Sequence, residues 1–395
     1  MNSVVNYLSA CFMFDIQSDP LVKAFERICF CDTAHECFEA YSIICHTLLS
    51  ENKSLSQYLY DLLAYGKHAV MEKCAASPTE MQKKGVEFDV MAVKLFSEYS
   101  SEKLKTAMSD RCDSEMLKAL PDYEHGTFDY TAEYFIEHYA RYGSGIFARY
   151  KAFSFDGEQL CPIESTDPIR LSDLKNYEVQ RKQVVDNTIC FLNGKPAQNV
   201  LLYGDRGTGK SSTVKALLNE YDELRMVELS KNDVSRLPLL FSLLKNSPLH
   251  FIVMIDDLTF VENDDRFGIL KAALEGSLAA CPANILVYAT TNRRKIIKET
   301  SAERSGEEIS RSDAIDESMT LADRFGLYVT FSKPDKKVYL DIVKKLADDR
   351  GLTLPDEELF AAAERFALRK SGRSPRTARR FVEHISACID LGLEY

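Results

Sequence analysis

Residues 199–213 read Asn-Val-Leu-Leu-Tyr-Gly-Asp-Arg-Gly-Thr-Gly-Lys-Ser-Ser-Thr. Between Gly204 and Ser211 they contain the complete pattern G-x-x-x-x-G-K-[ST], which is typical of a phosphate-binding loop. An apolar run precedes this pattern, and the segment from Ser212 to Tyr221 has the apolar spacing of a helix. A strand, a glycine-rich loop and a helix in this order are the context that the pattern requires. The stretch therefore predicts a site for the phosphates of a nucleotide.

Such a loop binds phosphates through its backbone, because glycines let successive N–H groups turn inward and the helix that follows adds a favourable field. We expect the Lys210 ammonium to reach the β- and γ-phosphates and the Ser211 hydroxyl to ligate Mg²⁺. The residues predicted to bind the nucleotide are consecutive: Gly204, Asp205, Arg206, Gly207, Thr208, Gly209, Lys210, Ser211 and Ser212.

The composition of the 395-residue chain, with 45% hydrophobic and 28% charged residues, is that of a globular protein with two or three domains. The formal net charge is −11, and nearly all of the acidic excess lies in residues 1–165. A general nucleic-acid clamp needs a basic footprint, so this part of the chain does not fit that class. Residues 1–13 lack a basic leader pattern and no apolar run approaches 18 residues, so we expect a cytoplasmic protein without a membrane span.

Helical periodicity dominates residues 1–145, which we expect to form an α-helical N-terminal domain. Residues 146–167 predict a short β-hairpin and a linker. Residues 168–332 begin with a helical pattern over 171–193, and strand and helix patterns then alternate. This predicts a parallel sheet of five strands flanked by helices. Residues 333–395 are helical again and predict a lid. The five strands are expected at 199–203, 224–229, 251–255, 285–290 and 327–331, and the lid helices at 335–349, 356–368 and 375–391.

The 11 cysteines follow no regular framework, and reduced thiols are the simplest interpretation. Cys29, Cys31, His35 and Cys37 are close enough in sequence to suggest a metal cluster, but their spacing matches no zinc pattern. The alternative is that these cysteines are partly buried at two helix ends, with Asp32 or Thr33 as the N-cap.

A pair of carboxylates, Asp256 and Asp257, follows the apolar strand that ends at Ile255. Ligands of α/β sheets bind at the carboxyl ends of the strands, where the loop at 204–210 also lies. We therefore expect Asp256 to hold Mg²⁺ opposite Ser211, and Asp257 to orient and polarise the attacking water. The alternative is that the two residues only cap the strand or the next turn.

Three more residues are candidates for the same site. Asn292 follows the next strand and is placed to hold the water beside the γ-phosphate; the alternative is a turn-forming Asn. Arg324 precedes the last strand and could reach a neighbouring subunit's phosphates, unless it only pairs with Asp323 or is solvated. Arg376 begins a lid helix after Pro375 and could reach the bound phosphates. Six basic residues between 369 and 380 equally allow a nucleic-acid contact.

In this order, Gly204–Ser211, Ile255–Leu258, Thr291-Asn292, Leu321–Gly326 and Ser374–Arg376 resemble the motifs of the AAA+ ATPases. The resemblance covers roughly residues 168–390. Within it, the chain is similar to a largely uncharacterised bacterial family of AAA+ ATP-binding proteins and, more distantly, to the replication initiator and helicase-loader group. Residues 1–165 resemble no family.

The resemblance implies a role for each motif residue. Lys210 and Ser211 match Walker A, Asp256 and Asp257 match Walker B, and Asn292 matches sensor 1. Arg324 matches the arginine finger, and Arg376 matches sensor 2.

The resemblance implies an enzyme that binds ATP or ADP with Mg²⁺ and hydrolyses ATP. Most AAA+ proteins have Glu where this chain has Asp257, so slow turnover is as plausible as rapid turnover. No Asn-Lys-x-Asp occurs where GTPases read guanine. The polar segment 299–318 is expected to be a surface loop at a subunit boundary.

We consider three functions. The first is an oligomeric ATPase, with Arg324 acting in trans, that remodels or loads a protein partner recognised by residues 1–165. The second is a nucleotide-dependent switch or scaffold with little turnover, and the third is a DNA-associated ATPase, which the net charge opposes. The sequence determines neither the partner nor the oligomer size.

Overall fold

The computed structural model describes residues 1–74, 77–261, 265–275, 282–292, 297–298, 324–370, 372–391 and 393. The chain folds as two compact units, Met1–Arg149 and Tyr150–Tyr395. Within the described part of the chain, no helix has both the length and the apolar character needed to cross a membrane.

Unit 1 is helical, as predicted. Its helices are α1 (Asn2–Ser9), α2 (Pro20–Phe30), α3 (Ala34–Glu51), α4 (Leu55–Tyr65), α5 (Ala69–Cys74), α6 (Glu80–Ser97), α7 (Ser101–Met108), α8 (Ser114–Ala119), α9 (Ala132–Tyr142) and α10 (Ile146–Arg149). Capping boxes fix the starts of α3, α4 and α6 through Thr33, Ser54 and Thr79. The predicted stripe Leu21, Phe25 and Ile28 is buried on α2, as 3.6-residue periodicity requires.

The corner between α2 and α3 decides between the two interpretations of the cysteine cluster. Cys31 and Cys37 form a disulfide across this corner, and both are buried. Thr33 caps α3 between them. The expectation of reduced thiols is therefore wrong for this pair, and two of the four candidate metal ligands are bonded to each other. Cysteine spacing did not predict the pair, because packing of α2 against α3 brings the two residues together.

Unit 2 is built on a sheet of seven strands in the order β2-β1-β4-β5-β7-β3-β9. The five predicted strands are present as β3 (Val200–Gly204), β4 (Leu224–Leu229), β5 (His250–Ile255), β7 (Ile285–Thr291) and β9 (Leu327–Phe331). They pair in parallel, and all seven residues of β7 are buried. Nearly continuous apolar strands are expected when helices cover both faces of a parallel sheet.

The predicted hairpin belongs to this sheet. Strand β1 (Ala152–Phe155) pairs in parallel with β4 and antiparallel with β2 (Leu160–Pro162). The two-strand hairpin is thus correct, but the sheet has seven strands where five were expected. The pairing with β4 is a long-range contact that the local pattern of the hairpin does not encode. A separate pair of short strands consists of β6 (Phe260–Val261) and β8 (Ile297–Lys298).

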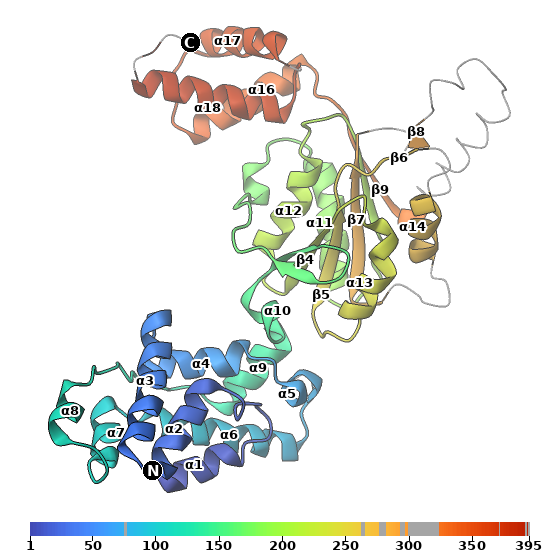
Figure 1. Cartoon of the computed structure of the whole chain (residues 1–395). Helices are drawn as coiled ribbons and strands as arrows, with labels where there is room; N and C mark the ends of the chain where they lie inside the picture. Colours follow the sequence, from blue (N-terminus) through green and yellow to red (C-terminus); the bar gives the residue numbers. More distant parts are fainter. Residues whose placement is uncertain are drawn as a thin grey trace. The chain divides into compact units, whose positions relative to one another are not determined.

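Helices cover both faces of the sheet (Figure 1): α11 (Glu178–Leu192) and α12 (Lys210–Glu220) lie on one, and α13 (Leu237–Leu244) and α14 (Asp265–Glu275) on the other. Val184 of α11 and Leu217 of α12 pack with Leu202 of β3 in one buried cluster. Two short 3₁₀ helices are η1 (Leu171–Asp173) and η2 (Val234–Arg236).

The helix predicted over 171–193 is shorter than expected. After η1 the chain passes through Asn176 and Tyr177, which have left-handed backbone angles (φ 68° and 63°), and α11 starts only at Glu178.

The lid forms as predicted, with α16 (Lys336–Asp349), α17 (Asp356–Arg369) and α18 (Pro375–Leu391). Its own small core includes Tyr339 and Ile342 of α16, Leu359 of α17, and Phe381 and Ile385 of α18. Asp335 caps α16 by accepting a hydrogen bond from the Val338 N–H.

Candidate functional site

The phosphate loop connects β3 to α12 at the carboxyl edge of the sheet. Gly209 directly precedes α12 with φ +97°, a backbone conformation that L side chains rarely adopt. Thr208 is buried, and its hydroxyl donates to the Asp205 carbonyl at 2.8 Å. These contacts hold the loop in the form that leaves backbone N–H groups available at the helix N-terminus.

Lys210 is buried (6% exposed) within the loop. Its Nζ donates to the carbonyl oxygens of Gly204 and Asp205, both at 2.8 Å, and to Oδ1 of Asn292 at 3.0 Å. Burial lowers the pKa of Lys210 from 10.5 to about 8, although the carboxylates of Asp205, Asp256 and Asp257 oppose this shift. Three neutral acceptors thus hold a cation that is costly to bury.

The two predicted Mg²⁺ ligands are in contact. Ser211 Oγ donates to Oδ1 of Asp256 at 2.6 Å, and the Thr290 hydroxyl donates to the same oxygen. Thr290 also accepts the Asp257 N–H at 3.1 Å, so it orients both acidic residues. Thr290 was not among the residues predicted to form the site. Its signal was a polar residue near the end of an otherwise apolar strand, which pairs with the strand that carries Asp256.

Asp257 and Asn292 are also joined, because Asn292 Nδ2 donates to Oδ1 of Asp257 at 2.7 Å. Asp257 has a left-handed backbone (φ 51°), a sparsely populated conformation that is often found at functional sites. Asn292 thus touches both Lys210 and Asp257.

The lid contributes Arg376, which lines the same cavity and whose backbone N–H donates to the Gly207 carbonyl at 3.1 Å. Two neighbouring arginines contact protein. Arg373 forms a two-point ion pair with Glu364, and Arg379 donates to the Asp173 carbonyl at 3.1 Å. Two of the six basic side chains between 369 and 380 thus bind protein groups of the same unit.

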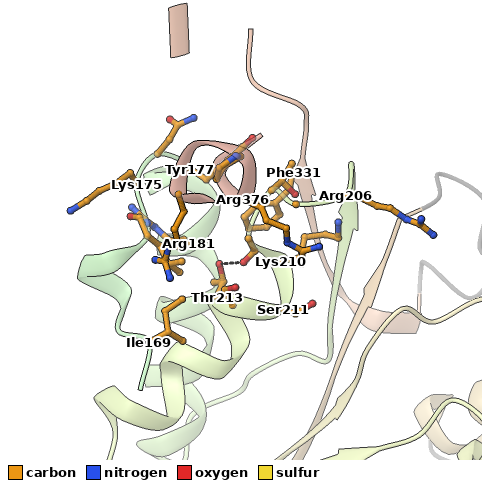
Figure 2. Close-up of a pocket in the computed structure, with 18 of the residues that line it drawn as sticks. Ile169, Lys175, Tyr177, Arg181, Arg206, Lys210, Ser211, Thr213, Phe331 and Arg376 are labelled. Atoms are coloured by element: carbon orange, nitrogen blue, oxygen red, sulfur yellow. Dashed lines mark hydrogen bonds between the residues drawn. The ribbon is translucent and has the colours of Figure 1, made fainter. Parts of the chain in front are cut away.

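A cavity of about 450 Å³ joins these groups, within the usual range for ligand sites. In Figure 2, Ile169, Lys175 and Arg181 lie across the pocket from Ser211, and the Arg206 side chain extends away from it. Arg206 is nevertheless one of the residues that line the cavity. Besides the phosphate loop, the cavity lining includes apolar side chains suited to a planar base: Ile169, Leu174, Tyr177, Phe331, Ile342 and Leu346.

The segment 167–177 supplies several of these apolar side chains, and it was not predicted to be part of the site. Asn219 Nδ2 holds it against α12 by donating to the carbonyls of Asp167 and Ile169, both at 2.8 Å. Lys175 pairs with Asp349 of the lid at 2.7 Å. No motif marks this segment, because its role depends on contacts with residues distant in the sequence. Asn176, a residue type that tolerates left-handed backbone, is the only local signal.

Arg324 is exposed and does not line the cavity. Other expectations for this region, which concern residues 299–318 and 321–323, lie outside the described residues. Among the predicted residues, the structure therefore brings together Lys210, Ser211, Asp256, Asp257, Asn292 and Arg376. Their combination of cations, backbone donors and carboxylates suits a phosphorylated ligand with a divalent cation.

Residues 148–389 match the family model described as "Protein of unknown function (DUF815)". The chain is 39% identical over 70 residues to the replication factor C large subunit of Staphylothermus marinus, and 31% identical over 127 residues to that of Thermofilum pendens. These matches cover 18% and 30% of this chain, and 16% and 30% of the two relatives, so the chain spans less than a third of either.

Among solved structures, the RuvB Holliday junction branch migration motor of Thermotoga maritima matches 57% of this chain and 66% of its own, with 17% identity and a TM-score of 0.39. The AAA+ resemblance predicted from the motifs is confirmed, as is the predicted fold class.

Proposed function

The chain belongs to the DUF815 family, and we propose that its second unit binds ATP with Mg²⁺ and hydrolyses it. The observation that supports this proposal is the meeting of Lys210, Asp256, Asp257, Asn292 and Arg376 around one cavity at the carboxyl edge of the sheet. ATP is the expected nucleotide, because no guanine-reading motif is present and the cavity is lined in part by apolar side chains.

Mg²⁺ fits the oxygen donors that the site offers. The Ser211 hydroxyl and the Asp256 carboxylate lie 2.6 Å apart, and hard cations of this kind prefer such ligands. When bound, the ion would neutralise negative charge on the β- and γ-phosphates.

The residues around the cavity would then have separate roles in hydrolysis. The Lys210 ammonium would exchange its carbonyl partners for phosphate oxygens, and the Asp257 carboxylate would orient a water and polarise it for attack. Asn292, already bonded to both residues, would position that water. Arg376 would add positive charge from the lid.

We further propose that the active form is a homo-oligomer in which Arg324 reaches a neighbour's nucleotide, while residues 1–165 recognise a protein partner. The exposed position of Arg324, away from its own cavity, supports action in trans. Arg is suited to this role because its planar guanidinium is always charged.

Mass measurement with and without MgATP, combined with steady-state turnover, tests this proposal. We expect MgATP to promote assembly, and Arg324→Ala to assemble but turn over about 10³-fold more slowly, as for other arginine fingers. Arg350→Ala, an exposed lid arginine paired with Glu383, is the control and should behave as wild type. If Arg324→Ala changes neither assembly nor turnover, the role in trans is wrong.

The Asp257–Asn292 hydrogen bond supports a second candidate function, a nucleotide-dependent switch with little turnover. The Asp257 side chain is one methylene shorter than Glu, and its Oδ1 already accepts the Asn292 amide at 2.7 Å. Turnover of many ATP per minute by the assembled wild-type protein would exclude this candidate. Tight MgATP binding with almost no turnover would favour it.

A further inference from the structure

The end of strand β9 lies directly against the phosphate loop. The Asp205 N–H donates to the Phe331 carbonyl at 3.0 Å. At Gly204 (φ +134°), a Cβ would lie 2.0 Å from that carbonyl oxygen, so only glycine allows this approach. The first turn of the phosphate loop is therefore built onto the strand that leads into the lid.

The Asp205 carboxylate makes a second contact with the same segment. Its Oδ2 accepts the Lys333 N–H at 2.8 Å. Between these two points, the Ser332 carbonyl accepts the Tyr177 hydroxyl at 2.6 Å. Residues 331–333, which we call the lid hinge because α16 of the lid starts at Lys336, are thus held by three hydrogen bonds.

Asp205 also contacts the catalytic lysine. Its carbonyl oxygen accepts Lys210 Nζ at 2.8 Å and the Thr208 hydroxyl, also at 2.8 Å. One residue therefore binds the lid hinge through its N–H and carboxylate, and Lys210 through its carbonyl. A carboxylate near bound phosphates would repel them unless it were held elsewhere, and the Lys333 N–H holds it at the hinge.

We propose that Asp205 is a positioning residue that couples the phosphate loop to the lid hinge. The inference rests on the proposed function, since phosphates would draw Lys210 Nζ away from the Asp205 carbonyl. The loop would then adjust, and the hinge would follow through the Lys333 N–H and the Phe331 carbonyl. The lid carries Arg376, so its placement over the nucleotide would depend on Asp205.

The test compares three variants of the full chain. Asp205→Ala removes the acceptor for the Lys333 N–H, whereas Asp205→Asn keeps an oxygen there and removes only the charge. Asp335→Ala is the matched control, because Asp335 also accepts a backbone N–H next to the hinge but contacts no part of the phosphate loop. The measurements are amide hydrogen exchange at the hinge with and without MgATP, the Kd of a fluorescent ATP analogue, and kcat.

We expect Asp205→Ala to speed exchange of the Lys333 amide by about 10-fold, as for the loss of one hydrogen bond to a charged group. MgATP should protect the hinge in wild type and no longer do so in this variant. Its kcat should fall about 10-fold while Kd changes less than about 3-fold, since the lost contact positions Arg376 rather than binding ATP. Asp205→Asn keeps a neutral acceptor for the Lys333 N–H and should recover part of both values. Asp335→Ala should affect only the first turn of α16.

The coupling is wrong if Asp205→Ala leaves the hinge response and kcat unchanged, or if Asp205→Asn resembles Asp205→Ala. A purely structural role would lower stability without separating kcat from Kd. If wild type binds no ATP analogue, the proposed function fails instead. In that case, hydrogen exchange at the Lys333 amide without nucleotide still tests whether Asp205 holds the lid hinge.

Discussion

Unit 1 and unit 2 each bury a charged side chain, and the two are held in different ways. Asp89, fully buried on α6, accepts the backbone N–H groups of Phe12, Met13 and Phe14 at 3.1, 2.8 and 2.9 Å. Lys210 in unit 2 is bound by two carbonyls and one side-chain amide, and it lines a cavity of about 450 Å³. Only the second charge faces space for a ligand.

The difference separates a structural charge from a functional one. The partners of Asp89 are backbone donors that have no other acceptor, so the carboxylate fixes the turn between α1 and α2. The partners of Lys210 are two backbone carbonyls and the Asn292 side-chain oxygen, all uncharged, and phosphate oxygens would bind the ammonium more strongly. Burial raises the pKa of Asp89 and lowers that of Lys210, so each charge depends on its partners.

The largest effect on activity is expected from removing the functional charge. Lys210→Ala should weaken MgATP binding and turnover by about 100-fold or more, as for the loss of a central charged donor at a phosphate site. Its thermal unfolding should stay close to that of wild type, since a costly buried cation is lost. Lys215→Ala, on the same helix but outside this cavity, is the control. Unaltered ATP binding by Lys210→Ala would mean that Lys210 is not a functional charge, so that it would not differ from Asp89 in this respect.

Removing the structural charge should lower the stability of unit 1 and leave MgATP binding unchanged. Asp89→Ala leaves three N–H groups of the core without an acceptor and should cost unit 1 about 4 kcal/mol of unfolding free energy. Exchange of the Met13 and Phe14 amides should accelerate, while MgATP binding at low temperature is unchanged. The exposed Asp129 is the control, and its substitution by Ala should cost less than about 0.5 kcal/mol. Normal protection of these amides in Asp89→Ala would contradict the structural role.

The same contrast explains what the sequence could predict. Residues 204–211 form one continuous motif, which the residue types alone identify as a phosphate loop. Strand periodicity places Asp256 and Asn292 at the same edge of the sheet. Five strands and the lid helices were therefore predictable. Asp89 looks like any polar residue on an amphipathic helix, because its partners lie 75 to 77 residues away. Thr290 and the 167–177 segment were missed for the same reason.

Local sequence patterns gave incomplete predictions where long-range contacts determine the structure. The residues of β1 and β2 predicted an isolated hairpin, and only the parallel pairing with β4 makes them part of the sheet. The helical pattern over 171–193 is interrupted where Tyr177 turns to reach the Ser332 carbonyl. Asp205 was expected only as one of the loop residues that bind the nucleotide, and the bond of its carboxylate to the Lys333 N–H, which spans 128 residues, was not predicted.

The smaller of the two expected effects on stability is the pH dependence that the buried Lys210 imposes. Its folded pKa of about 8 lies below the ordinary value of 10.5, so between these pH values the unfolded chain holds a proton that the folded chain has lost. Lys210 therefore destabilises the fold below pH 8, and this penalty is relieved as the pH rises to 10.5. Linkage limits the change to about 3 kcal/mol.

Urea unfolding of wild type and Lys210→Met across this range measures the effect, because other titrating groups cancel in the difference. Wild type should gain stability relative to the variant as the pH rises from 8 to 10.5. A saturating ATP analogue should flatten the difference, since nearby phosphates stabilise the ammonium. A difference that is already flat without nucleotide would mean that the carbonyls and Asn292 hold the ammonium as well as water does. In that case Lys210, like Asp89, would be a satisfied structural charge.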